Sequence, residues 1–184
     1  MQMNFLKTTV AVAGAMLASI PSFAASNQAT APETQAQLEE RVRHELVMLP
    51  YFNIYDDLSF RVENGKVTLL GEVTRPTLKS DAEGVVKRIA GVTSVQNQIE
   101  VLPLSNFDNG IRQRVTQAVY GQSALNRYAL GAHPSIHIIV KNGNVTLQGV
   151  VANDMDRNIA GIQANSVSGV FNVTNNLRVE NKRS

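Results

Sequence analysis

The chain has 184 residues, of which 43% are hydrophobic, 17% charged and 5% aromatic, and it contains no cysteine. These proportions are typical of a folded protein and not of a disordered or disulfide-stapled one. The lack of cysteine excludes thiolate catalysis, disulfides, cysteine-ligated zinc and acylation at a lipobox cysteine. A formal net charge of +2 is too small for the dense basic surface that nucleic-acid binding requires.

The first 24 residues have the layout of a signal peptide. A basic start is followed by an uncharged apolar run over residues 10–20, and small residues precede a predicted cut between Ala24 and Ala25. This run is shorter than the ~20 residues that span a bilayer. We therefore expect residues 1–24 to be removed, residues 25–33 to form a flexible leader, and the mature protein to be periplasmic with no transmembrane segment.

The rest of the chain contains an internal sequence repeat with two copies. A shift of 78 positions superimposes residues 60–73 on residues 138–151 without a gap. Both segments contain the pattern Asn-Gly-Xaa-Val-Thr-Leu-Xaa-Gly-Xaa-Val, and the register continues downstream. We therefore predict two domains, residues 34–103 and residues 107–180.

Each domain is predicted to begin with a helix, because apolar residues recur there at spacings of three and four. The two stripes are Leu38, Val42, Leu46 and Leu49, and Ile111, Val115 and Val119. Asp108 is the expected N-cap of the second of these helices. Only residues 104–106 separate the two domains, so we expect Leu104 and Phe107 to pack at the junction.

A β-hairpin follows in each domain, because apolar residues alternate on both sides of an Asn-Gly pair. A two-residue Asn-Gly connection favours a type I′ turn, since both central residues need positive φ. Glu63 and Lys66 flank the first turn and are expected to face each other. The residues assigned to turns, strand ends and helix ends are Asn64, Gly65, Gly71, Gly91, Asn142, Gly143, Gly149 and Gly169.

After the hairpin come a second helix and a last strand. Pro76 suits the first turn of this helix in the first domain, and Asn153 is the expected cap in the second. Gly161 costs about 1 kcal/mol relative to alanine, so the second domain's helix is expected to be the less stable one. The first domain's stripe is Leu78, Ala82, Val85 and Ile89, and Gly91 would end its helix. Each domain is thus an α+β unit, helix-strand-strand-helix-strand, with two helices on a three-stranded mixed sheet.

This arrangement resembles the BON domain (bacterial OsmY and nodulation) family. The resemblance rests on Val-Xaa-Asn-Gly-Xaa-Val-Thr-Leu-Xaa-Gly-Xaa-Val, then a helix, then Gly-Val-Xaa-Xaa-Val-Xaa-Asn-Xaa-(Ile/Leu)-Xaa-Val, in both domains. With no lipobox cysteine, the chain is similar to osmotically inducible periplasmic proteins of the OsmY type and unlike dual-BON outer-membrane lipoproteins. The resemblance implies a non-enzymatic envelope protein, associated with phospholipid surfaces or with other envelope proteins and often with stress.

The sequence carries no strong catalytic or metal-binding pattern. His133 and His137 are four residues apart, but Pro134 between them disfavours the helix that would bring both rings to one face. Gly-Xaa-Ser-Xaa-Gly, a phosphate loop and a Rossmann glycine triplet are all missing. We therefore predict no enzymatic activity, no metal and no cofactor.

One segment distinguishes the second domain, which has five extra residues within residues 120–133. Two interpretations stay open. Leu125, Tyr128 and Leu130 extend the preceding helix and pack inward, or the segment contacts a lipid headgroup interface or an apolar protein surface. Residues 51–55 of the first domain pose the same choice. The candidate lipid- or partner-contact residues are Arg112, Arg114, Tyr120, Arg127 and Tyr128.

Two functional classes remain open. The first is a periplasmic, stress-related chaperone-like or scaffolding protein that holds unfolded or envelope proteins by apolar grooves and sheet edges. The second is a peripheral phospholipid-binding module that maintains envelope integrity. Residues 34–103 hold eight basic and ten acidic side chains, and residues 107–180 hold six and four, so the second domain suits an anionic surface better. Attachment would be weak and salt-sensitive, and the lack of an acyl group slightly favours the first class.

Overall fold

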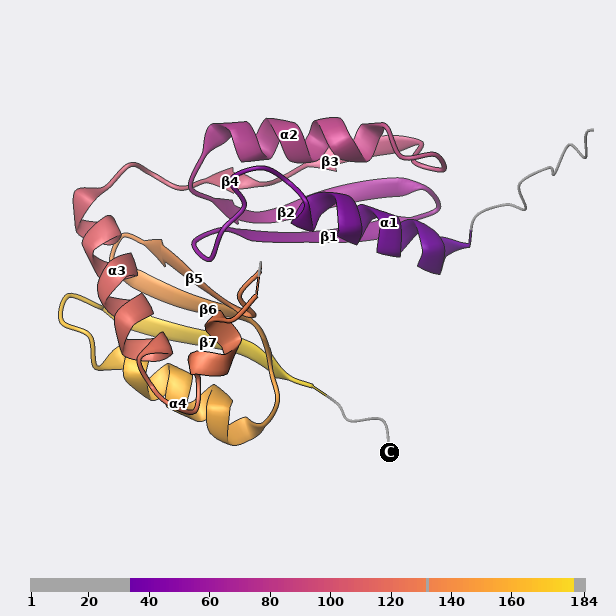
Figure 1. Ribbon diagram of the computed structural model, residues 1–184. Coiled ribbons are helices and arrows are strands. Elements are labelled where there is room, and N and C mark those ends of the chain that lie inside the picture. Colours follow the sequence, from indigo (N-terminus) through magenta and orange to yellow (C-terminus); the bar gives the residue numbers. More distant parts are fainter. Residues whose placement is uncertain (1–33, 132, 181–184) are drawn as a thin grey trace, which may run out of the picture. The chain divides into compact units, whose positions relative to one another are not determined.

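The computed structural model describes residues 34–131 and 133–180. These residues belong to one compact unit. The predicted signal peptide and the leader lie outside the described residues. Within them, the expected order helix-strand-strand-helix-strand is confirmed in both domains (Figure 1). No helix in the described part is long and apolar enough to cross a membrane.

The first domain is a mixed sheet with two helices packed on one of its faces. Strands β1 (Asp57–Glu63) and β2 (Lys66–Val73) form the antiparallel hairpin. The predicted last strand is divided into β3 (Ser94–Asn97) and β4 (Glu100–Val101), and both parts pair parallel to β2. The helices are α1 (Gln35–Val47) and α2 (Pro76–Lys87). As expected, Glu63 lies opposite Lys66 beside the turn.

The second domain repeats this topology. Strands β5 (Ile136–Lys141) and β6 (Asn144–Val151) are antiparallel, and the uninterrupted β7 (Asn172–Val179) runs parallel to β6. The helices are α3 (Asn106–Tyr120) and α4 (Asp154–Asn165). A short 3-10 helix, η1 (Asn126–Ala129), lies in the segment that holds the extra residues.

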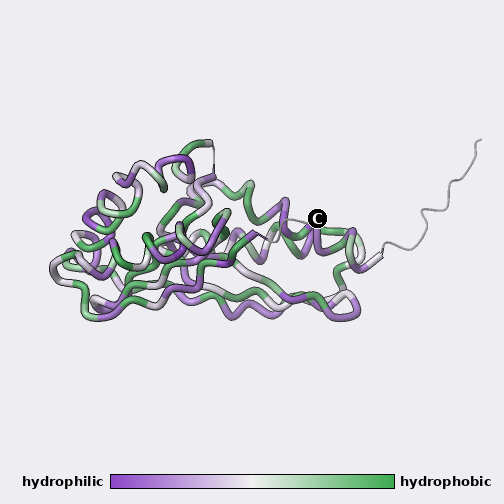
Figure 2. The backbone as a smooth tube through the Cα atoms, turned by 90° about the horizontal axis from the view of Figure 1, so that it is seen from below, coloured by the Kyte–Doolittle hydropathy of each residue, from purple (hydrophilic) through white to green (hydrophobic). Residues whose placement is uncertain are grey.

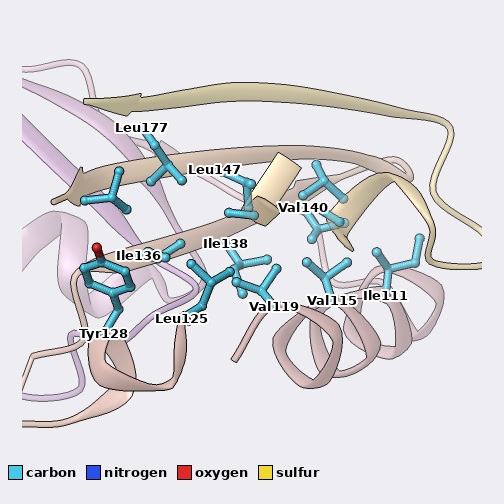
Figure 3. Close-up of a cluster of buried hydrophobic side chains, with 14 residues drawn as sticks. Ile111, Val115, Val119, Leu125, Tyr128, Ile136, Ile138, Val140, Leu147 and Leu177 are labelled. Carbon is cyan, nitrogen blue, oxygen red and sulfur yellow. The ribbon is translucent and has the colours of Figure 1, made fainter. Parts of the chain in front are cut away.

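Each domain has its own hydrophobic core between sheet and helices. The predicted stripes of α1 and α3 are buried, and Figure 3 shows how Ile111, Val115 and Val119 of α3 point at strand β5. On α2 the predicted Val85 is half-buried against the core, and the fully buried residue is its neighbour Val86. Hydrophobic and hydrophilic segments alternate along the chain (Figure 2), as expected when each element buries one face.

The helix starts agree with the sequence in two cases and differ in one. Pro76 is the first residue of α2, and Asn153 caps α4 with its side chain. Asp108 is not the N-cap of α3, because α3 begins earlier and the hydroxyl of Ser105 accepts the hydrogen bond from the Asp108 amide at 3.1 Å. Asp108 is instead the third residue of the helix and is buried.

The predicted packing of Leu104 and Phe107 at the junction is wrong. Leu104 is 98% exposed, and Phe107 lies against Phe171 with ring centroids 6.0 Å apart. The two domains meet elsewhere, through the loop before β1. The amide of Ile138, on the outer edge of β5, donates to the carbonyl of Ile54 at 2.7 Å. This contact satisfies part of an edge strand that would otherwise be open.

Candidate functional site

The asparagine shared by the two sequence motifs fastens the last strand to the second helix. The Asn97 side-chain amide donates to the carbonyl of Lys79 at 2.8 Å, and the Asn175 amide donates to the carbonyl of Arg157 at 2.7 Å. In each domain the asparagine oxygen accepts from the backbone amide two residues further on, at 3.1 and 3.2 Å. The asparagine that the two domains share therefore stabilises the fold.

The repeated Asn-Gly pairs form turns in which every residue has positive φ, between 50° and 77°. The next glycine in each domain has a different constraint. A Cβ at Gly71 would lie 2.2 Å from the carbonyl oxygen of Asp57, and one at Gly149 would lie 1.9 Å from that of Ser135. These positions allow the hairpin strands to approach closely. All the residues that the sequence assigns to turns, strand ends and helix ends have positive φ: Asn64, Gly65, Gly71, Gly91, Asn142, Gly143, Gly149 and Gly169.

A buried carboxylate holds the second turn in place. Asp108 is 1% exposed and accepts hydrogen bonds from the backbone amides of Asn142 at 3.0 Å and Gly143 at 2.8 Å. Both amides belong to the tight turn and face away from the β-ladder. The acidic residue at the start of α3 thus supports the hairpin tip of its own domain.

The extra segment of the second domain builds a hydrogen-bonded anchor. It does not continue α3 as one interpretation expected, since η1 is a separate turn. Leu125 and Tyr128 are buried, whereas Leu130 is 72% exposed. The Tyr128 hydroxyl donates to the Asp156 carboxylate at 2.5 Å and accepts from the Ala152 amide at 2.8 Å.

The backbone amide that follows the hairpin has a hydrogen-bond acceptor in both domains, but the acceptor differs. Thr74, which the repeat aligns with Ala152, donates its amide to the Asp56 carboxylate at 2.6 Å. Asp56 is fully buried and belongs to the loop before β1. The extra segment of the second domain supplies the Tyr128 hydroxyl at the equivalent place.

The five candidate contact residues do not form one exposed surface. Arg112 and Tyr128 are buried. The hydroxyl of half-buried Tyr120 donates to a backbone carbonyl, and burial raises the pKa of Tyr120 to about 12. Arg127 is exposed but pairs with the Asp156 carboxylate at the start of α4, whereas exposed Arg114 donates to the carbonyl of Ser168 beyond the end of α4. Helix α4 has 12 residues and is about 18 Å long, so the two guanidinium groups bind near its opposite ends.

Two exposed aromatic side chains, Phe107 and Phe171, lie near Arg114 in the second domain. Phe107 is 51% and Phe171 is 73% exposed. The Phe171 ring lies over Gly143, where a Cβ would approach it to 2.5 Å, and a Cβ at Gly169 would lie 3.5 Å from the Phe107 ring and 3.3 Å from the Arg114 guanidinium. We call Phe107, Phe171 and Arg114 the aromatic patch.

Sequence reasoning missed Phe171. Its signal was a difference between the repeats, because the shift that aligns them places Thr93 of the first domain on Phe171 of the second. A phenylalanine at a position that tolerates a small polar residue is a candidate for a surface role.

Three carboxylates form a row across the first sheet. Asp57 lies opposite Glu72, and Glu72 lies beside Glu100. Burial raises the pKa of both Asp57 and Glu72; for Glu72 the Lys141 ammonium opposes this shift, and the charges of Glu100 and Asp57 add to it. Lys141 of β5 donates to both oxygens of Glu100, at 2.6 and 2.7 Å. Among residues 34–131 and 133–180, no group of three or more acidic or histidine side chains is arranged to hold a metal ion.

A cleft of about 780 Å³ lies where the loop of residues 52–55 meets α3. Its charged and titratable lining comes from both domains and includes Tyr55, Arg75, Arg112, His133 and His137. Tyr55 also touches α3 directly, because the Thr116 hydroxyl donates to the Tyr55 hydroxyl at 3.3 Å. Local sequence patterns do not reveal this site, because the loop and α3 are about 60 residues apart in the chain.

Comparison with known proteins identifies one family. The family model described as "BON domain" matches residues 34–103 and 108–181. No curated protein matches the chain. Two similar solved structures come from CdsD, a structural protein of the Type III secretion system of Chlamydia trachomatis. The first, its C-terminal domain, is 15% identical with a TM-score of 0.29 and covers 80% of this chain and 100% of that one. The second is 16% identical with a TM-score of 0.28, and the coverage is 78% and 93%.

Proposed function

Because this chain belongs to the BON domain family, we propose that it is a non-enzymatic binding protein of the cell envelope whose second domain attaches peripherally to phospholipid. BON domains occur in periplasmic and envelope proteins, are associated with phospholipid binding and are generally non-enzymatic. The aromatic patch is the observation that carries the proposal for this chain.

The patch combines the two chemistries of a membrane interface. Two phenylalanine rings stand together in solvent, although neither Phe107 nor Phe171 is needed to fill the core. The Arg114 guanidinium lies beside them, with a carbonyl as its only hydrogen-bond partner among the described residues. Aromatic rings that enter the headgroup region beside a cation that stays in water match the polarity of that layer.

The expected strength is that of a reversible attachment. Complete burial of a phenylalanine side chain contributes about 1.5–3 kcal/mol, and both rings begin half or more exposed. Insertion of the pair therefore contributes about 2–4 kcal/mol, and a basic residue near an anionic surface adds about 1 kcal/mol. The sum corresponds to a dissociation constant on the order of 1 mM or somewhat below.

Vesicle co-sedimentation of the mature chain tests this proposal. We expect binding to vesicles of phosphatidylcholine mixed with phosphatidylglycerol, and weaker binding at high salt. Replacing both Phe107 and Phe171 by serine should abolish binding. The matched control replaces Met155 and Ile162 of α4, which are 71% and 66% exposed, by serine and should bind normally. Normal binding by the double phenylalanine variant would contradict the proposal.

Binding of other envelope proteins is a second candidate function, supported by the free edge of β7. This strand has eight residues and pairs on one side with β6; within the described residues nothing pairs with its other side. An extended segment of an unfolded or envelope protein can add to such an edge through backbone hydrogen bonds. A chaperone-like or scaffolding role would follow from this mode of binding.

Amide NMR spectra with an unfolded client protein test this second candidate. We expect the client to perturb amide signals of β7 and to aggregate more slowly in the presence of the chain. Perturbation elsewhere with β7 unchanged would count against strand addition, even if aggregation were slowed.

We also propose that the chain is exported to the periplasm, that its expression rises under osmotic stress, and that its domains span residues 34–103 and 107–180. The apolar run of residues 10–20 supports export. N-terminal sequencing of the protein from a periplasmic fraction should return Ala25 as the first residue. Recovery of the uncut chain from the cytoplasm would refute the export proposal.

A further inference from the structure

The cleft between the loop of residues 52–55 and α3 has the size and charge of a small-anion site. Its volume of about 780 Å³ falls in the range of pockets that enclose small organic ligands. Arg75 and Arg112 line it together with His133 and His137, and no aspartate or glutamate does. The charged lining is therefore of one sign.

Arg112 is a buried cation that forms no salt bridge with another described residue. It is 4% exposed; its Nη2 donates to the Val140 carbonyl at 2.7 Å, and its Nη1 donates to Asn109 Oδ1 at 2.6 Å. Its Nε is buried and has no hydrogen-bond partner among the described residues. Burial lowers the pKa of this guanidinium, and the nearby charges of Asp108 and Asp56 only oppose that shift. Burying a cation without a paired anion is costly, and an anion in the cleft would relieve this cost.

His137 is held in a defined orientation on the same wall. Its Nδ1 lies 2.7 Å from the carbonyl oxygen of Asp56. Because a carbonyl only accepts, Nδ1 carries a proton, and Nε2 has no partner among the described residues. The ring also stacks on Phe52, with centroids 5.4 Å apart. The imidazole is therefore a fixed part of the wall, against which an apolar body can pack at little cost in side-chain entropy.

The rest of the lining mixes polar side chains, Asn53, Thr74, Asn109 and Gln113, with apolar ones. Phe52, Ile54, Leu104 and Pro134 line the cleft. Leu104 is 98% exposed, so a ligand with an apolar body would cover a side chain that the protein itself leaves in water.

We propose that this cleft binds a small organic carboxylate with an aromatic or branched apolar body. The carboxylate would be attracted by Arg112 at the inner wall and Arg75 at the rim, and the body would lie against Phe52 and Leu104. A planar carboxylate suits a guanidinium, and the apolar side chains Phe52, Leu104 and Pro134 in the lining favour an organic anion over a bare inorganic one. The site shares no residue with the aromatic patch, so it goes beyond phospholipid attachment.

Titration of the full mature chain with phenylacetate, followed by amide NMR, tests the proposal. Saturable shifts are expected in residues 52–55 and in α3 around Arg112. Phenylacetamide has the same shape without the charge and should bind at least about tenfold more weakly, because charge-assisted hydrogen bonds are the stronger ones. Equal binding of the amide, or phosphate binding as tight as phenylacetate binding, would overturn the proposal.

Two variants keep the test independent of folding. Arg112→Gln should abolish binding, but its side chain also holds the Val140 carbonyl. Arg75→Gln changes an exposed residue at the rim and should weaken binding severalfold, whereas Arg88→Gln, an exposed change outside the cleft, should not. Unchanged affinity in Arg75→Gln and Arg112→Gln, or no saturable binding by the parent chain, would refute the site. Loss of vesicle binding in the double phenylalanine variant, with phenylacetate binding intact, would show that the two sites are separate.

Discussion

Replacing Tyr128 by phenylalanine tests whether the extra segment of the second domain is an anchor. The change removes one oxygen and keeps the ring that packs in the core. The lost hydroxyl donates to the Asp156 carboxylate at 2.5 Å and accepts from the Ala152 amide at 2.8 Å. It also accepts from Nη2 of Arg127 at 3.0 Å, but this guanidinium is exposed and water can replace the hydroxyl there. Asp156 keeps its bonds to Arg127 and Asn153, but the Ala152 amide loses its partner.

The size of the effect follows from the bonds to Asp156 and Ala152. A hydrogen bond to a charged group contributes about 1.5–3 kcal/mol, and the neutral bond to the amide of exposed Ala152 contributes about 0.5–1.5 kcal/mol. Because Asp156 stays partly satisfied, we expect a loss of about 2–4 kcal/mol in the free energy of unfolding. This is a large part of the stability of an ordinary small domain, which is about 5–15 kcal/mol.

Urea denaturation followed by circular dichroism measures this loss. Tyr51→Phe is the matched control, because Tyr51 is 66% exposed and its hydroxyl has no hydrogen bond among the described residues. The control should change stability by less than about 0.5 kcal/mol. If Tyr128→Phe unfolds at the same urea concentration as the parent chain, the anchor contributes nothing and the reasoning is refuted.

Three further changes test other parts of the structure by the same assay. Asp108→Ala leaves two turn amides without their acceptor and should cost about 2–4 kcal/mol; a cost below about 0.5 kcal/mol would contradict this role. Gly161→Ala should not gain the usual ~1 kcal/mol of helix propensity, because the new Cβ would lie 2.7 Å from the Asn175 amide nitrogen; a clear gain would contradict the contact. The raised pKa of Glu72 means that its contribution is most favourable below its unfolded pKa and is lost as the pH rises through the raised value. Glu72→Gln should therefore be more stable than the parent by a few tenths of a kcal/mol at neutral pH and show no gain in acid; equal stability at both would contradict the row of carboxylates.

Much of the fold follows from local patterns that occur twice. Spacings of three and four identify all four helices, and the Asn-Gly pairs identify both hairpins. The N-cap of α3 does not follow from residue type, because Ser105 and Asp108 are both good caps and lie three positions apart. The cap is set by the residue at which the backbone becomes helical.

The candidate site was harder to predict than the fold. Arginine and tyrosine are typical of interfaces, but Arg112 and Tyr128 are buried and bond to Val140 and Asp156, which are 28 residues away in the chain. Phe171 shows the opposite difference. An apolar residue beside a strand is usually buried, but Phe171 is exposed. Exposure is a property of the packed domain, and local periodicity does not contain it.

A single tryptophan at Phe171 gives the most direct test of phospholipid attachment. The natural chain contains no tryptophan, so the emission of Phe171→Trp reports on the aromatic patch alone. Met155→Trp, at the other end of α4, is the control. We predict that anionic vesicles shift the emission of Phe171→Trp to shorter wavelength and leave that of Met155→Trp unchanged. Unshifted Phe171→Trp emission while the protein co-sediments with vesicles would contradict the account.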